Sequence, residues 1–183
     1  MLIVLASSSF ALADTVDLRS QTDNDGGSRE ISFCARPSPD KPGLPGHAFI
    51  AFSEEKDGKR SIRAIGHTAF SVGEALLSYS GIITGDGALV DEKYTSIKQH
   101  CLTLQVNRAD YERAYGQALQ PLKAMGIDLD ETMPIQKNYS LAAEDCVGFL
   151  INQAKVFAPR LVIPSRKIGE LPLRYVRRLI DAN

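Results

Sequence analysis

The sequence predicts one α+β domain in which a small antiparallel sheet packs against helices. The chain has 183 residues, of which 44% are hydrophobic and 23% are charged, so it is long enough to bury one core and too apolar for wholesale disorder. Strand-like segments come first along the chain and helix-like segments follow them. This order is typical of an α+β fold rather than of a doubly wound parallel sheet.

The predicted strands lie in the first two thirds of the chain. Alternating or continuously apolar runs predict strands over residues 30–35, 47–52, 61–66 and 99–106. Between the second and third of these, Asp57-Gly58 is a hairpin-turn signal. The glycine-rich stretch 81–91 is expected to be a loop.

The predicted helices lie mostly in the second half. They are expected over residues 72–80, from residue 107 onward, over 145–157 and over 171–180. Asn107 is a good N-cap, and Asp110 places a negative charge in the first turn of the helix that follows. Pro121 is expected to kink or end that helix, because proline lacks the backbone N–H that a helix interior needs.

The first residues resemble part of an export signal. Residues 1–13 carry no charge, and Ala11-Leu12-Ala13 is a small-residue pattern of the kind that signal peptidases cut after. The basic residues that usually precede such a run are absent, and a buried N-terminal strand is the alternative. We therefore expect an exported protein, periplasmic or secreted, with a flexible lead-in over 14–29 and a single domain over 30–183. No other segment is long and apolar enough for a membrane helix, so we expect no integral membrane segment.

The charge balance argues against nucleic acid as a partner. The formal net charge is −1, and a protein that replaces phosphate counterions needs a basic face. The nearest basic patch is Arg174, Arg177 and Arg178, spaced as on a solvated helix face. No nucleic-acid partner is therefore expected.

The three cysteines are consistent with export. Cys34 and Cys101 lie in strand-like stretches, and an oxidising compartment favours the pairing of two of the three. If Cys34 and Cys101 pair, chain-entropy models give about 4 kcal/mol of stabilisation for so long a loop. Three separate buried thiols are the alternative.

Cys146 has the most informative local setting. Polar and acidic residues precede it, and it opens an apolar helix-like run. A thiol in the first helical turn is close to the positive end of the helix dipole and to free backbone N–H groups, which favour the nucleophilic thiolate. The same N–H groups can bind an oxyanion. An inert, packed core cysteine is the alternative.

A cysteine nucleophile needs a base, and the chain has three histidines. His47 begins a predicted strand, where its ring could emerge at the end of the sheet and take the thiol proton. His67 follows the partner strand and could orient His47, or it could be a loop histidine. We interpret His100, beside Cys101, as structural or exposed. No two histidines have a zinc-ligand spacing, so neither a metal nor a cofactor is expected.

The segment Asp145-Cys146-Val147-Gly148-Phe149-Leu150 resembles the D-C-S-G-[LF]-[VIL] nucleophile motif of the NlpC-type, papain-like cysteine peptidases. Because Gly46-His47-Ala48-Phe49 comes before the cysteine, the order resembles the circularly permuted branch, which includes lecithin:retinol acyltransferase-like proteins. The resemblance implies a papain-like domain with the His strand before the Cys helix. It also implies Cys146 as nucleophile, His47 as base, His67 as third residue, and Tyr139 and Asp145 at the substrate site. Val147 replaces the usual serine of the motif.

These observations predict an exported cysteine hydrolase that forms an acyl-enzyme at Cys146 and cleaves an amide bond. Cell-wall peptide, hence peptidoglycan, is the expected substrate, by compartment and family analogy. An acyltransferase or lipid esterase on the same scaffold is the first alternative, because the same acyl-enzyme serves an acyl substrate of either kind. A secreted binding or inhibitory module without catalysis is the second.

Overall fold

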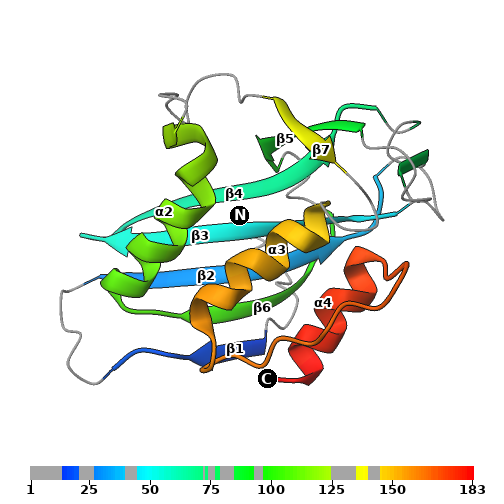
Figure 1. Ribbon diagram of the computed structural model, residues 1–183. Helices are drawn as coiled ribbons and strands as arrows, with labels where there is room; N and C mark the ends of the chain where they lie inside the picture. The colour runs from blue at the N-terminus through cyan, green and yellow to red at the C-terminus, as the bar shows by residue number, and fades with distance from the viewer. Residues whose placement is uncertain are drawn as a thin grey trace, which may run out of the picture.

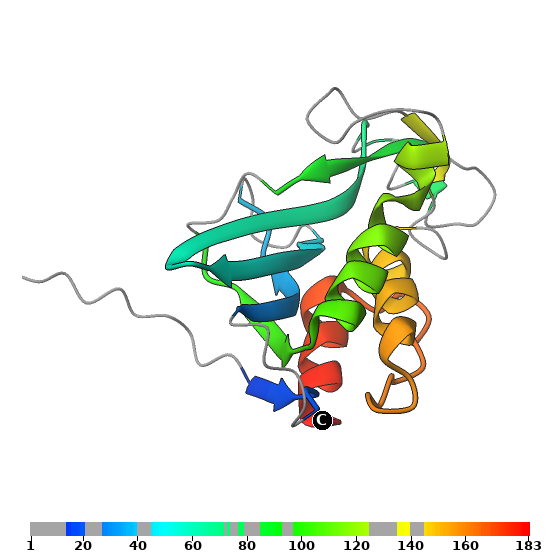
Figure 2. The same cartoon turned by 90° about the vertical axis from the view of Figure 1, so that its left-hand side faces the viewer.

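The computed structural model describes residues 14–20, 27–39, 45–71, 73, 77–78, 85–92, 97–124, 135–139 and 145–183. Within these residues the architecture is α+β: the helices α2, α3 and α4 cover one side of a seven-stranded sheet. Figures 1 and 2 show from two directions that the helices lie on the same side of the sheet. The predicted fold class is therefore confirmed. Three stretches with sequence predictions lie outside the described residues: the expected signal segment 1–13, residues 21–26 of the expected lead-in, and most of the expected helix 72–80.

The strands are β1 (Asp14–Asp17), β2 (Ser28–Arg36), β3 (His47–Lys56), β4 (Lys59–Ala69), β5 (Gly85–Asp91), β6 (His100–Gln105) and β7 (Ile135–Tyr139). Their order across the sheet is β1-β6-β2-β3-β4-β5-β7. All neighbouring pairs are antiparallel except β1 and β6, which are parallel. The sheet is therefore mainly antiparallel, as predicted, with one parallel pair at its edge.

The helices are α2 (Arg108–Ala124), α3 (Cys146–Ala154) and α4 (Pro172–Asp181), and the short 3-10 helix η1 (Lys155–Phe157) continues α3. All three helices pack on the sheet face that carries the alternate residues Ile31, Phe33 and Ala35 of β2. On β3 the residues of that face are Ala48, Ile50 and Phe52. Because strand side chains alternate between faces, this set defines the helix-covered face.

Two local predictions agree with the structure. The turn between β3 and β4 has Asp57 at φ 53° and Gly58 at φ 70°, the positive values that a two-residue type I′ hairpin requires. The side chain of Asn107 accepts a hydrogen bond from the backbone N–H of Asp110 at 2.7 Å and so caps α2. Helix α2 continues through Pro121 to Ala124, so Pro121 does not end the helix at its own position.

Two segments differ from their predictions. Part of the expected flexible lead-in is β1, because Val16 and Leu18 pack against the core beside β6. The stretch 81–91, expected as a loop, contains β5, which pairs with β4 and buries Leu89. In both places tertiary pairing outweighs a polar or glycine-rich composition.

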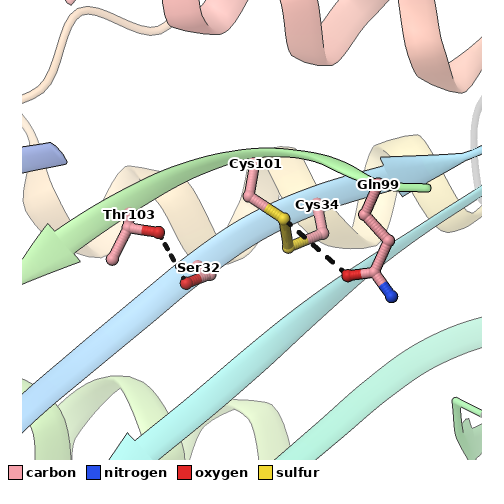
Figure 3. The surroundings of a disulfide bond; sticks show 5 residues. All are labelled: Ser32, Cys34, Gln99, Cys101 and Thr103. Carbon is pink, nitrogen blue, oxygen red and sulfur yellow. Dashed lines mark hydrogen bonds between the residues drawn. A yellow bond between two sulfur atoms is a disulfide. The ribbon is translucent and has the colours of Figure 1, made fainter. Parts of the chain in front are cut away.

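Cys34 and Cys101 form a disulfide between β2 and β6, which settles the pairing that the sequence left open (Figure 3). The two cysteines face each other directly in the antiparallel register, with their Cα atoms 4.2 Å apart. The neighbouring cross-strand pair, Ser32 and Thr103, is joined by a 2.8 Å hydrogen bond between hydroxyl groups. The disulfide therefore adds a covalent link to two strands already held in one register, on the face opposite to the helices.

Candidate active site

Cys146 is the first residue of α3, and the helix begins there because Asp145 caps it. Oδ1 of Asp145 accepts hydrogen bonds from the backbone N–H groups of Val147 at 3.1 Å and Gly148 at 2.9 Å. These are two of the N–H groups that a helix start leaves without a partner inside the helix. The aspartate of the sequence motif therefore builds the helix end that presents the thiol.

The thiol of Cys146 is buried between α3 and the sheet. The residue is 3% exposed and belongs to the hydrophobic core, and it is the free cysteine of the three. Burial, together with the neighbouring charge of Asp145, raises the pKa of the thiol to about 12. The backbone N–H groups of Ala48 and Val147 and the charge of Arg166 act in the opposite direction. The sequence predicted a thiol pKa lowered by the helix start, and burial outweighs that effect.

His67 lies on the same sheet face as Cys146. It faces Leu89 across the β4–β5 pair, and Leu89 belongs to the helix-covered core. The sulfur of Cys146 is close enough to the backbone N–H of Ala48 to accept a hydrogen bond from it. Ala48 on β3 and His67 on β4 each lie two residues beyond the paired Ile50 and Ile65, toward the same end of the sheet. Since α3 packs on both strands, the structure brings Cys146 and His67 to one region.

His47 lies on the opposite face. Its neighbour Ala48 points toward the helices, so strand alternation turns the imidazole of His47 away from them. Two contacts agree: Nε2 of His47 is 3.3 Å from Oγ1 of Thr68, and the ring stacks beside that of Phe49 with centroids 6.5 Å apart. The sequence predicted His47 as the partner of Cys146 and His67 as its support. In the structure, His67 lies on the sheet face that α3 and Cys146 cover, and His47 lies on the other face.

A buried ion pair holds the surroundings of His47. Nη2 of Arg36 lies 3.0 Å from Oε1 of Glu92, and both side chains are more than nine-tenths buried. The other carboxylate oxygen of Glu92 lies 3.9 Å from Nε2 of His47. Burial lowers the pKa of His47 to about 4; Glu92 opposes this shift, whereas Arg36 and His67 add to it. The imidazole is therefore neutral at pH 7. Sequence reasoning missed Arg36 and Glu92, because neither lies in a recognisable motif.

The two residues expected at the substrate site have different surroundings. Both carboxylate oxygens of Asp145 are engaged within the protein: besides the helix cap, they accept two hydrogen bonds from Arg166, each 2.7 Å long. In the structure Asp145 caps α3, and its contact with substrate stays a prediction. Tyr139 is the last residue of β7, paired with Gly85 of β5, and its contact with substrate stays a prediction.

His100 lies beside the C-terminal helix α4. His100, at the start of β6, lies with Nε2 3.4 Å from Nη2 of Arg177 on α4. Within the described ranges, no three His, Cys, Asp or Glu side chains are grouped so that they could hold a metal ion. Among the described helices, none combines the length and the apolar character needed to cross a membrane.

Comparison with known proteins gives one structural likeness. No protein-family model matches the sequence, and no curated protein matches it. Among solved structures, the type VI secretion system effector TseH is similar over 85% of this chain and 89% of its own, with 13% sequence identity and a TM-score of 0.49. The functional argument therefore depends on the residues of this chain.

Proposed function

We propose that this chain is an exported cysteine hydrolase with a permuted papain-like arrangement, in which Cys146 is the nucleophile and His67 the base. The observation that carries the proposal is the position of Cys146 at the capped start of α3, on the sheet face that also carries His67. A thiol at a helix start beside an imidazole is the arrangement that nucleophilic thiol catalysis needs.

The proposed chemistry begins from a neutral pair. With a pKa of about 12, the thiol of Cys146 is protonated at neutral pH, so the base removes its proton as the sulfur attacks. The sulfur adds to the carbonyl carbon of an amide, and backbone N–H groups at the start of α3 would stabilise the oxyanion. The C–N bond then breaks, the amine leaves with the proton from the imidazolium, and water hydrolyses the resulting thioester.

The disulfide supports the proposed compartment. Cys34 and Cys101 are bonded, and such bonds persist in oxidising compartments such as the periplasm or the extracellular space. A peptide of the bacterial cell wall is the amide substrate that fits this location best. An acyltransferase or lipid esterase would use the same thioester, so muropeptides and lipid esters should be tested side by side.

The burial of the thiol favours a second candidate, a secreted binding module without catalysis. Cys146 is 3% exposed, and the loss of hydration disfavours its thiolate. Such a module would keep the scaffold and leave the cysteine as core packing. It predicts that Cys146 reacts with an alkylating reagent only after unfolding.

The deciding experiment compares three variants for hydrolysis of cell-wall peptides and lipid esters. Cys146→Ala should abolish activity, and His67→Gln should reduce kcat/KM by at least about 100-fold, the usual contribution of a general base. His100→Gln is the matched control, because it removes an imidazole on β6 and should leave activity unchanged. Full activity in the Cys146→Ala variant would refute the proposal.

A fourth variant, His47→Gln, tests which histidine is the base. If the base is His67, this variant should keep most of its activity, because the His47 ring lies on the far face of the sheet. Loss of activity in His47→Gln together with retention in His67→Gln would assign the role to His47. Alkylation of the folded, non-reduced protein measures the reactivity of the Cys146 thiol directly, because the other two cysteines are bonded in the disulfide.

A further inference from the structure

The start of α3 is held by an ion pair from a distant part of the chain. The N–H groups on Nη1 and Nη2 of Arg166 donate to Oδ1 and Oδ2 of Asp145, respectively, in a bidentate pair with both distances at 2.7 Å. The side chain of Asp145 is 2% exposed and that of Arg166 is 16% exposed, so the pair is largely shielded from water. A guanidinium that engages both oxygens fixes the orientation of the carboxylate as well as its charge.

Oδ1 of Asp145 joins the ion pair to the helix. This one atom accepts from Arg166 and from the backbone N–H groups of Val147 and Gly148, the two residues after Cys146. A rotation of the carboxylate would therefore break the helix cap as well as the ion pair. The position of the Cys146 backbone thus depends on where Arg166 holds Asp145.

The segment that carries Arg166 is itself anchored to α4. The hydroxyl of Tyr175 donates to the backbone oxygen of Pro164 at 3.1 Å, and Arg178 donates to the backbone oxygen of Ser165 at the same distance. Arg178 also binds both oxygens of Glu170, at 2.7 and 2.8 Å. The loop on either side of Arg166 is therefore fixed, and Arg166 reaches Asp145 from a rigid support.

We propose that Arg166 is a positioning residue for Cys146, acting through the Asp145 cap at the start of α3. The proposal rests on the nucleophile role proposed above. The charges that act on the thiol are those of Asp145 before it and Arg166 from the loop before α4, and His67 of β4 lies on the sheet face that the helices cover. Asp145 raises the thiol pKa and Arg166 lowers it, so the two charges act on the thiol in opposite directions.

The test measures alkylation of Cys146 by iodoacetamide in folded, non-reduced protein across a pH series. Arg166→Gln leaves the charge of Asp145 unopposed, and we expect labelling about tenfold slower at a fixed pH, as for a rise of one pKa unit. Arg166→Lys should restore most of the rate, and Asp145→Asn should shift the pH profile in the opposite direction. The double variant Asp145→Asn/Arg166→Gln removes both charges, so no buried charge is left without its partner. It replaces Arg166→Gln in the comparison if that single variant does not fold.

The matched control is Arg160→Gln. Arg160 pairs with Asp110 at 2.7 Å near the start of α2, so this variant removes an arginine from an aspartate at another helix, where Asp110 keeps its second partner, Arg113. Slower labelling in Arg166→Gln but not in Arg160→Gln supports the proposal. Equal rates in the two variants, including equal acceleration through unfolding, would overturn it. The labelling experiment needs no substrate. If the wild type hydrolyses no substrate but the variants are labelled in the expected order of rates, the proposed function is refuted and the positioning role of Arg166 stands.

Discussion

The imidazole of His47 lies against the backbone of Gly66 on the neighbouring strand. A Cβ atom added at Gly66 would collide with Nε2 of His47 and would lie 3.2 Å from the backbone oxygen of Ala48. Glycine is therefore required at this point of β4, because the histidine ring occupies the space that a side chain would need.

This relationship predicts that Gly66→Ala destabilises the protein by about 1–3 kcal/mol, the usual cost of overpacking a filled site. The measurement is the free energy of unfolding from urea titration. Gly116→Ala is the matched control: a Cβ at this helical glycine meets nothing within 4 Å, so this change should stabilise the protein by about 0.5–1 kcal/mol. A Gly66→Ala variant as stable as the wild type would show that the His47 ring is free to move.

The lowered pKa of His47 predicts a stability that depends on pH. Its pKa is about 4 in the folded protein and near 6.5 when unfolded, so the unfolded chain binds more protons between these values. The contribution of His47 to the free energy of unfolding is complete above pH 6.5 and decreases as the pH falls toward 4. The total loss is at most about 3 kcal/mol. Urea titrations at pH 4.5 and 7 should show a smaller difference for His47→Gln than for the wild type. An equal difference would contradict the prediction.

The disulfide predicts a large loss of stability on its removal. Cys34 and Cys101 are 67 residues apart in sequence, and chain-entropy models give about 4 kcal/mol for closing such a loop. The double variant Cys34→Ala/Cys101→Ala should lose that much of the free energy of unfolding. Ser32→Ala is the control, since it removes only the neighbouring hydrogen bond to Thr103 and should cost about 1 kcal/mol. Similar losses in the two variants would contradict the prediction.

Features decided by neighbouring residues could be predicted from the sequence. The Asp57-Gly58 turn depends on two backbone conformations that these residues adopt at low cost. The cap at Asn107 depends on a side chain that reaches a backbone N–H three residues away. The apolar run after the polar residues before Cys146 predicts a helix from 145 onward, and α3 begins at Cys146 with Asp145 as its cap.

Features decided by distant pairing could not be predicted. The run from His47 to Phe52 is apolar after its first residue, and both Ala48 and Phe49 are buried, although they point to opposite faces. Hydrophobic alternation therefore gave no sign of which face the helices cover, so the sequence could not show that His67, and not His47, lies on that face. Arg166 is missing from the sequence argument for the same reason, because only the folded loop brings it to Asp145.

The cap of α2 provides a test of local design that does not involve the candidate site. Oδ1 of Asn107 accepts from the backbone N–H of Asp110, and its backbone oxygen accepts from the N–H of Tyr111 at 3.0 Å. Asn107→Ala removes the side-chain acceptor and should cost about 1 kcal/mol, whereas Asn107→Asp keeps the acceptor and should cost little. Urea titration at pH 7 compares the two. Equal stability of the Ala and Asp variants would mean that the helix start is held by its core contacts and not by the cap.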